Sequence, residues 1–198
     1  MLCYNRAMRH TDYVITMKMG EWIERSSYGL AFIRFIAQWG WYLVLVGAGV
    51  VIYLMNQGMW LETAIYLGAS TFLARFICTE LIRLFWKRKR PYAVLQHTPP
   101  FSQLAVVPAI LYQLPVFSYL QKTAQYSFPS GHAALYGAIS FVIWWRFGII
   151  GWIFLGATLF MGMARVAAGL HWFSDVCVGL LIGILSAVLV IYSLGIDF

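Results

Sequence analysis

Apolar runs separated by short polar breaks occupy most of the chain. Five of them, at about residues 39–55, 61–86, 132–145, 149–165 and 172–194, are interrupted by few charges. An α-helix rises about 1.5 Å per residue and needs about 20 apolar residues to cross a bilayer core of ~30 Å. The pattern predicts an all-α, polytopic transmembrane helix bundle of about five spans.

Two segments depart from this pattern. Residues 1–26 mix basic with aromatic and aliphatic side chains, which favours an amphipathic helix at the membrane interface. Residues 92–130 form a long connection with several prolines, and its apolar stretch at 104–120 is interpreted as a short re-entrant or interfacial helix. We therefore expect a single domain over 1–198, with an N-terminal interfacial segment at 1–37 and a catalytic helix bundle at 38–195.

The composition supports an integral membrane protein. Hydrophobic residues make up 62% of the chain and charged residues 11%. Soluble domains carry about 25% charged residues. The net charge of +7 gathers at helix ends and in the long connection, so anionic lipid or a phosphate compound is the expected partner and nucleic acid is not. The 3 cysteines show no paired spacing, and no cluster has the spacing of metal ligands, so we expect neither metal nor cofactor.

A first basic cluster follows the second predicted span. Arg83, Lys87 and Arg90 are spaced i, i+4 and i+7, which would place them on one face of a continuing helix. Arginine binds phosphate oxygens with two parallel hydrogen bonds. Arg88 and Lys89 are interpreted as topology-determining charges.

A second cluster, Pro129-Ser130-Gly131-His132, opens the third span. Ser130 suits a helix N-cap, and Gly131 lets an anion approach the backbone and the positive end of the helix dipole. His132 could donate a proton to a leaving oxygen. The alternative for this cluster alone is a capped helix with an interfacial histidine.

The third cluster contains Arg165, His171 and Asp175. Asp175 lies one turn beyond His171, where a carboxylate can accept the Nδ1 proton and leave Nε2 as a nucleophile. A buried His–Asp pair with a structural role is the alternative. With five spans, all three clusters fall on the same membrane face, where they supply what phosphoryl transfer needs without a metal.

In order and spacing, these clusters resemble the type 2 phosphatidic acid phosphatase superfamily of membrane lipid phosphatases. The family pattern is Lys-x6-Arg-Pro, Pro-Ser-Gly-His and Ser-Arg-x5-His-x3-Asp. This chain has Arg83-x6-Arg90-Pro91, Pro129-Ser130-Gly131-His132 and Ala164-Arg165-x5-His171-x3-Asp175. Arg83 replaces the usual lysine and Ala164 the usual serine; neither change removes a nucleophile or a proton-transfer group.

The resemblance implies roles for individual residues. His171 would attack phosphorus and form a phosphohistidine, Asp175 would orient His171, and His132 would protonate the leaving group. The remaining implied residues would hold the phosphate: Arg83, Arg90, Arg165, Ser130 and Gly131, with Lys87 as an additional candidate.

The resemblance also suggests the substrate and location. The short form is similar to small bacterial members that convert undecaprenyl diphosphate to undecaprenyl phosphate, whereas phosphatidylglycerophosphate, phosphatidate and lipid A phosphates remain open. A lipid phosphotransferase and a non-enzymatic lipid-binding or transport protein are the competing functions. The family implies a bacterial inner or plasma membrane with the site facing away from the cytoplasm, although the basic residues on the same side favour the opposite orientation. The sequence does not determine the oligomeric state.

A few further polar residues have no place in the motifs. We expect Arg75, near the middle of the second span, to lie too deep for the phosphate and to pair with Glu62 or a polar group on another helix. Glu80 precedes Arg83 by three residues and could hold it in place. His97 is expected to be solvated.

Overall fold

The computed structural model describes residues 2–55, 58, 60–95 and 126–194. These residues form helices joined by short turns, and their only β contact is a single bridge between Lys89 and Tyr126. The elements are α1 (Leu2–Glu24), α2 (Ser27–Met55), α3 (Trp60–Phe72), the π-helical η1 (Leu73–Cys78), α4 (Thr79–Phe85), α5 (Pro91–Val94), α7 (Gly131–Phe147), α8 (Ile150–Ala167) and α9 (Phe173–Ser193). The predicted interfacial helix at 104–120 and His97 lie outside the described residues.

Long apolar helices confirm the predicted membrane bundle. Within the described part of the chain, four helical stretches are long and apolar enough to span: Tyr28–Met55, Trp60–Phe85, Ile150–Ala167 and Phe173–Ser193. The remaining predicted span, the third along the chain, corresponds to α7 and has 17 residues. That is about 26 Å of helix, at the lower limit for crossing a bilayer. On the outer face of α9, Leu181, Leu185 and Leu189 are each more than half exposed, as expected of side chains that contact lipid.

The first span is longer than predicted. Helix α2 begins at Ser27 rather than near residue 39. No proline interrupts residues 27–38, and most of them are apolar. The helix therefore continues through the segment predicted to lie at the interface.

Close backbone contact between α7 and α9 holds the centre of the bundle together. A Cβ atom at Gly137 would lie 2.7 Å from the Leu180 carbonyl oxygen, and one at Gly183 would collide with the Ala134 carbonyl oxygen. Gly179 and Gly183 are four residues apart, the spacing by which small residues let membrane helices approach closely. This contact sets the relative position of the two helix N-termini.

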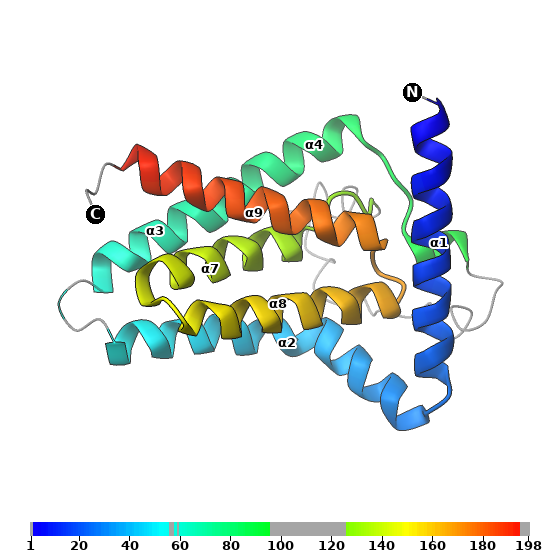
Figure 1. Ribbon diagram of the computed structural model, residues 1–198, viewed down its shortest axis with the longest axis horizontal. Helices are drawn as coiled ribbons and strands as arrows, with labels where there is room; N and C mark the ends of the chain where they lie inside the picture. The colour runs from blue at the N-terminus through cyan, green and yellow to red at the C-terminus, as the bar shows by residue number, and fades with distance from the viewer. Residues whose placement is uncertain (1, 56–57, 59, 96–125, 195–198) are drawn as a thin grey trace, which may run out of the picture.

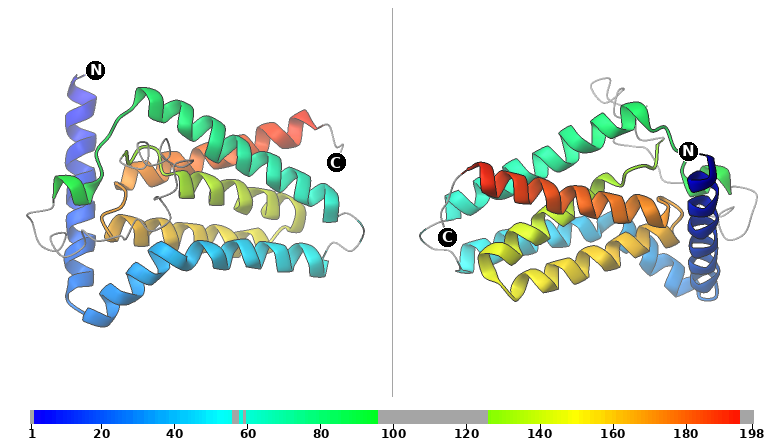
Figure 2. Two further views of the ribbon diagram at one scale, coloured as in Figure 1. Left: turned by 180° about the vertical axis from the view of Figure 1, so that it is seen from behind. Right: turned by 45° about the horizontal axis from the view of Figure 1, so that its top comes forward.

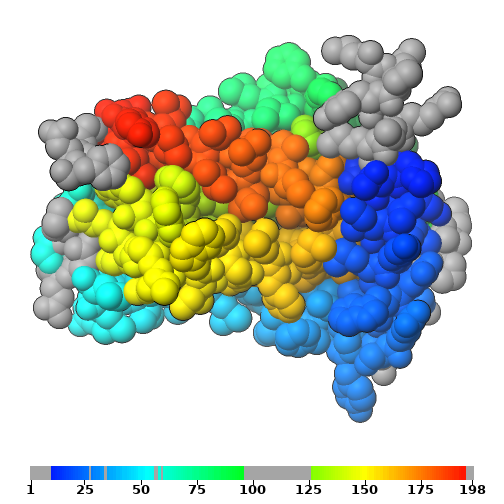
Figure 3. Space-filling view, in the orientation of Figure 1, coloured from blue at the N-terminus to red at the C-terminus, as the bar shows by residue number. Residues whose placement is uncertain are grey.

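Helix α1 runs across one end of the bundle instead of along it (Figure 1). Both views in Figure 2 show the same crossing, and α1 contacts α2, α8 and α9. In Figure 3 its atoms lie against the ends of α8 and α9. A helix placed across the spans has the orientation expected at a membrane surface. The three sequence clusters lie at this same end.

Candidate active site

The first cluster is divided between a helix and an extended segment: Arg83 lies in the last turn of α4, whereas Lys87 and Arg90 follow the end of the helix. Helix α4 ends at Phe85, where Trp86 takes φ −120° and ψ 87°. Along residues 87–90, Lys87 and Lys89 are exposed, whereas Arg88 and Arg90 are partly buried, the alternation of an extended chain. The predicted helical face shared by Arg83, Lys87 and Arg90 is therefore wrong.

Pro91 helps to keep this segment extended. It begins α5, and the Arg90 that precedes it has φ −70 and ψ 151, in the extended region. The proline ring restricts the preceding residue to such backbone, because a helical conformation would clash with it. The segment can therefore not continue α4 as far as Arg90.

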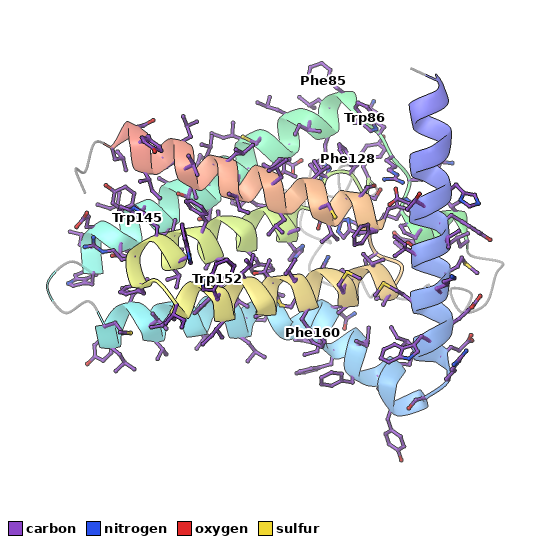
Figure 4. The ribbon with its side chains drawn as sticks, viewed as in Figure 1. Phe85, Trp86, Phe128, Trp145, Trp152 and Phe160 are labelled. Carbon is purple, nitrogen blue, oxygen red and sulfur yellow. The ribbon has the colours of Figure 1, made fainter. Side chains whose placement is uncertain are left out.

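This segment positions the residues just before α7. The Ser127 amide donates to the Arg88 carbonyl oxygen at 2.8 Å, beside the bridge between Lys89 and Tyr126. The Trp86 and Phe128 rings pack with their centroids 5.6 Å apart, at the end of α4 (Figure 4). The second cluster is thereby held next to the first.

The start of α7 is capped as predicted. The Ser130 hydroxyl oxygen accepts from the Ala133 amide at 3.4 Å, and the Ser130 amide donates to the Asp175 carbonyl oxygen at 3.0 Å. Arg83 donates through Nη2 to the Pro129 carbonyl oxygen at 3.1 Å, and its Nη1 binds Glu80 at 2.8 Å, which confirms the predicted Glu80–Arg83 pair.

A glycine-terminated turn carries the third cluster. Gly169 has a positive φ of 68 degrees, which a glycine adopts without strain. The Leu170 amide donates to the Arg165 carbonyl oxygen at 3.0 Å and the Gly169 amide to that of Val166 at 2.9 Å, the pattern of a Schellman C-cap. Arg90 donates through Nη1 to the Leu170 carbonyl oxygen at 3.1 Å. The turn after α8 therefore presents His171 between the first two clusters.

His171 is buried, with 1% of its side chain exposed. Its Nδ1 lies 2.8 Å from the Ser127 carbonyl oxygen and 3.8 Å from Asp175 Oδ2. Because a carbonyl oxygen can only accept, Nδ1 carries the proton and Nε2 keeps its lone pair. The expected tautomer is obtained, but the expectation that Asp175 accepts the Nδ1 proton is wrong.

The two carboxylate oxygens of Asp175 instead accept hydrogen bonds from other groups near the start of α9. Its Oδ2 accepts from the Trp172 amide at 2.8 Å, and its Oδ1 accepts from Arg88 Nη1 at 2.8 Å. A carboxylate in the first helical turn is well placed to bind such free amides. Asp175 Oδ2 thus lies 3.8 Å from His171 Nδ1 without a hydrogen bond to it.

The arginines of all three clusters surround the two histidines. Burial, followed by the charges of Arg90 and Arg165, lowers the pKa of His171 well below its ordinary value, so the imidazole is neutral at pH 7. His132 is partly buried and experiences the charges of Arg165, Arg75 and Arg90, and also interacts electrostatically with His171. Arg165 is anchored by donation from its Nη1 to the Ala37 carbonyl oxygen at 2.7 Å. The structure therefore brings the predicted clusters together, except that Lys87 is exposed.

Arg75 lies at this site, contrary to expectation. A Cβ atom at Gly131 would be 2.7 Å from Arg75 Nε, so the guanidinium covers the glycine that opens α7. Arg75 pairs with Glu80 at 2.6 Å, while Glu62 pairs with Arg146 at 3.4 Å. The depth argument fails because Gly131, which opens α7, lies directly beside Arg75 in the bundle. The π-helical turn Leu73–Cys78 contains Arg75, and such turns are often found at functional sites.

Arg88 has a structural role that its interpretation as a topology-determining charge does not include. Arg88 donates to Ser174 Oγ at 2.7 Å, to Asp175 Oδ1 at 2.8 Å and to Asp12 Oδ2 at 2.6 Å. It is thus a structural cation held among polar groups of the bundle. In an extended segment, alternate residues point to the same side, so Arg88 would be expected to point inward with Arg90. This expectation requires knowing that the helix ends at Phe85, which the sequence did not show.

The described residues offer no evident metal centre. Among them, no three His, Cys, Asp or Glu side chains gather in a way that could hold a metal ion. The described groups at this site that can contact a phosphate include cationic side chains, imidazoles and the amides at the start of α7.

Comparison with known proteins identifies the fold and the family. The profile of the PAP2 superfamily matches residues 63–196. The chain belongs to the PAP2 superfamily. It is therefore an integral membrane protein of the PAP2 phosphatase family, and α1 and α2 precede the matched region.

Two individual proteins resemble this PAP2 chain. The crystal structure of Aquifex aeolicus LpxE superimposes with a TM-score of 0.62 over 91% of this chain and 94% of that one, at 20% identity, which supports the fold alone. The bacitracin transport permease protein BcrC of Bacillus licheniformis is 37% identical over 67 residues, which are 34% of this chain. The match spans 33% of the length of that relative.

Proposed function

We propose that this PAP2 protein hydrolyses a lipid phosphate or diphosphate without a metal, through a phosphohistidine on His171. The observation that carries the proposal is the state of His171: it is buried, its Nδ1 proton is bound by Ser127, and Nε2 keeps a lone pair amid the charges of Arg83, Arg90 and Arg165. A neutral imidazole held in one tautomer is the form required of a nucleophile.

The reaction would proceed in two displacements. Nε2 of His171 attacks phosphorus, the bond from phosphorus to the leaving oxygen breaks, and His132 gives that oxygen its proton. The ring becomes positively charged as the phosphohistidine forms. The Asp175 carboxylate, at 3.8 Å from Nδ1, stabilises that charge. His132 then takes a proton from water, which attacks phosphorus and breaks the P–N bond. Free phosphate leaves and His171 is regenerated.

The phosphoryl oxygens would be held by Arg83, Arg90 and Arg165 together with the Gly131 amide. Ser130 contributes by capping α7, the helix whose N-terminus faces the anion. Arg75 adds a further positive charge above Gly131. Fixed donors of this kind stabilise the charge that develops on the equatorial oxygens in the transition state.

A lipid substrate is supported by the apolar flank of the site. Leu84, Phe85 and Trp86 are 49%, 85% and 56% exposed at the end of α4, directly before the basic segment. A lipid could leave its chain against these side chains while its head group enters. We propose undecaprenyl diphosphate as the first substrate, with undecaprenyl phosphate as the leaving group, because the short chain is similar to small bacterial members of the family. The lipids to test next are phosphatidylglycerophosphate, phosphatidate and lipid A phosphates.

The test is phosphate release from undecaprenyl diphosphate in detergent with excess EDTA, for the wild type, His171→Ala and the exposed control His10→Ala. We expect turnover by the wild type and the control. His171→Ala should lose on the order of 10³-fold or more, as for other covalent nucleophiles. Equal release by wild type and His171→Ala would contradict the mechanism. Release that stops with EDTA and returns with a divalent cation would contradict the metal-free reaction.

Two other functions remain distinguishable. A phosphotransferase would pass the phosphoryl group to an added lipid or sugar acceptor and yield a phosphorylated product. A lipid-binding or transport protein would keep its function in His171→Ala; the name of the BcrC relative, a bacitracin transport permease protein, is the observation that favours testing this.

A further inference from the structure

Helix α1 contributes a buried carboxylate to the end of the bundle that holds the catalytic pair. Asp12 is 2% exposed, although α1 precedes the region matched by the family profile. Its Oδ1 accepts from the Ser174 amide at 2.9 Å and its Oδ2 from the Ser174 hydroxyl at 2.6 Å. A carboxylate at the first turn of α9 is favoured there by the free amides and the helix dipole.

Arg88 joins this carboxylate to Asp175. Its Nη2 lies 2.6 Å from Asp12 Oδ2, and its Nη1 lies 2.8 Å from Asp175 Oδ1. The guanidinium carbon also lies 5.1 Å from the centroid of the Trp172 ring, and this cation–π contact limits its movement. Two buried carboxylates, one on α1 and one on α9, therefore share a single cation.

We propose that Asp12 is a positioning residue for the His171–Asp175 pair and acts through Arg88. The proposal rests on the proposed function, in which Asp175 stabilises the positive charge that His171 acquires during attack. An isolated pair of Arg88 and Asp175 would carry no net charge. The second carboxylate leaves the group with a net negative charge and holds the Arg88 fork, so that Asp175 stays in place with its charge directed at His171.

A purely structural role for Asp12 makes a different prediction. If Asp12 only fastened α1 to the bundle, its loss would lower stability, and activity would fall only in proportion to the folded fraction. Thr16 supplies a control for a change on the same buried face of α1, because it is fully buried, lies one turn from Asp12, and its hydroxyl has no hydrogen-bond partner in the described part of the chain.

The experiment compares Asp12→Asn, Arg88→Gln, the double variant and Thr16→Val as full-length proteins in detergent, on the lipid that the wild type hydrolyses. We expect Asp12→Asn to lower kcat about tenfold or more with KM within about twofold, since the interaction acts in the transition state. Thr16→Val should match the wild type. Because Asp12 acts through Arg88, the double variant should be no slower than Arg88→Gln, instead of showing the summed loss of two independent sites.

Three outcomes would overturn the proposal: wild-type kcat in folded Asp12→Asn, additive losses in the double variant, or an equal loss in Thr16→Val. If Asp12→Asn is poorly folded, Asp12→Glu replaces it, because glutamate keeps the negative charge. Asp12→Glu should retain more activity than its effect on thermal unfolding predicts. Activity that falls only in proportion to unfolding would contradict the proposal.

A second readout does not depend on turnover. The imidazole ¹⁵N resonances of His171, assigned with His171→Gln, should shift in Asp12→Asn, and that shift should vanish when Arg88→Gln is the background. A wild type that hydrolyses no lipid phosphate would reject the proposed function but leave this test in place. Unchanged resonances in Asp12→Asn would reject the role of Asp12 even in an active enzyme.

Discussion

At the scale of single residues, arginines close in sequence have different tasks. Arg75 and Arg83 share one oxygen of Glu80, at 2.6 and 2.8 Å, and face the start of α7, whereas Arg88 binds the two buried aspartates. The planar fork of Arg83 binds Glu80 and the Pro129 carbonyl oxygen with two different nitrogens. The single ammonium of the usual lysine cannot do this in the same geometry. The replacement therefore keeps the charge and adds an attachment to α7.

The neutral state of His171 leads to a prediction about pH. Burial, Arg90 and Arg165 lower the pKa of His171 below its ordinary 6.5, so the nucleophile stays deprotonated as the pH falls through that value. The acid limb of kcat/KM that belongs to His171 should lie below that pH. Removal of one positive charge in Arg90→Gln should raise the pKa of His171 and move the limb to higher pH.

The measurement is kcat/KM from acidic to neutral pH for both proteins on one lipid. Substrate titration is common to both profiles, so their difference reports on the enzyme. An acid limb of Arg90→Gln that moves to lower pH would contradict the assignment. In the folded protein, the same lowered pKa means that the stabilising contribution linked to neutral His171 is lost as the pH falls. The loss of stability begins as the pH falls below the ordinary pKa and continues until the pH reaches the lower pKa of the folded state.

At the scale of elements, the site depends on how closely α7 approaches α9. Ser130, His132 and the Gly131 amide belong to the start of α7, while Asp175 belongs to the start of α9. The two starts are joined by the hydrogen bond from the Ser130 amide to the Asp175 carbonyl oxygen at 3.0 Å. Any substitution that separates the helices farther along should therefore also disturb the site.

Gly183→Leu tests this dependence. A side chain there collides with the backbone of α7 at Ala134 and Ala138. Overpacking of this kind costs about 1–3 kcal/mol. We expect a lower midpoint of thermal unfolding in detergent and reduced turnover per folded molecule. Gly156→Leu on α8 is the matched control, since its Cβ would meet nothing within 4 Å. Equal stability of the two variants would show that the α7–α9 contact is looser than described.

At the scale of the whole molecule, the two ends of the bundle differ. All three clusters lie at the end crossed by α1, while the opposite end has the Glu62–Arg146 pair at 3.4 Å and the exposed turn at Ile149. At the site end, the charge of Arg88 is matched within the protein by Asp12 and Asp175. We keep the proposal that the site faces away from the cytoplasm.

Cysteine labelling in intact cells checks this orientation. In a background without the 3 native cysteines, Ser26→Cys reports the site end and Ile149→Cys the other end. Both positions are exposed, and neither substitution changes the net charge. A membrane-impermeant thiol reagent should label Ser26→Cys and leave Ile149→Cys unlabelled until the membrane is opened. The reverse pattern would place the site in the cytoplasm.

Local features of the chain were sufficient for several conclusions. The length and polarity of the apolar runs predicted the helical membrane bundle, because a span needs only internal hydrogen bonds and apolar side chains. The Ser130 cap and the Glu80–Arg83 pair were predicted because both depend on neighbours three residues apart. The order and spacing of the three clusters identified the PAP2 superfamily, which the profile match confirmed.

Contacts between distant segments decided the rest. The proton on His171 Nδ1 is accepted by the backbone carbonyl oxygen of Ser127, and no side-chain pattern in the sequence indicates such an acceptor. The Asp175 carboxylate instead binds the Trp172 amide at the start of α9 and Arg88. The partner of Arg88 on α1 is separated from it by 76 positions. Sequence determined which segments form helices and which groups can react, because these properties are local. Only the packing of the helices decided which carboxylate meets which arginine, because those choices depend on close approach between elements far apart along the chain.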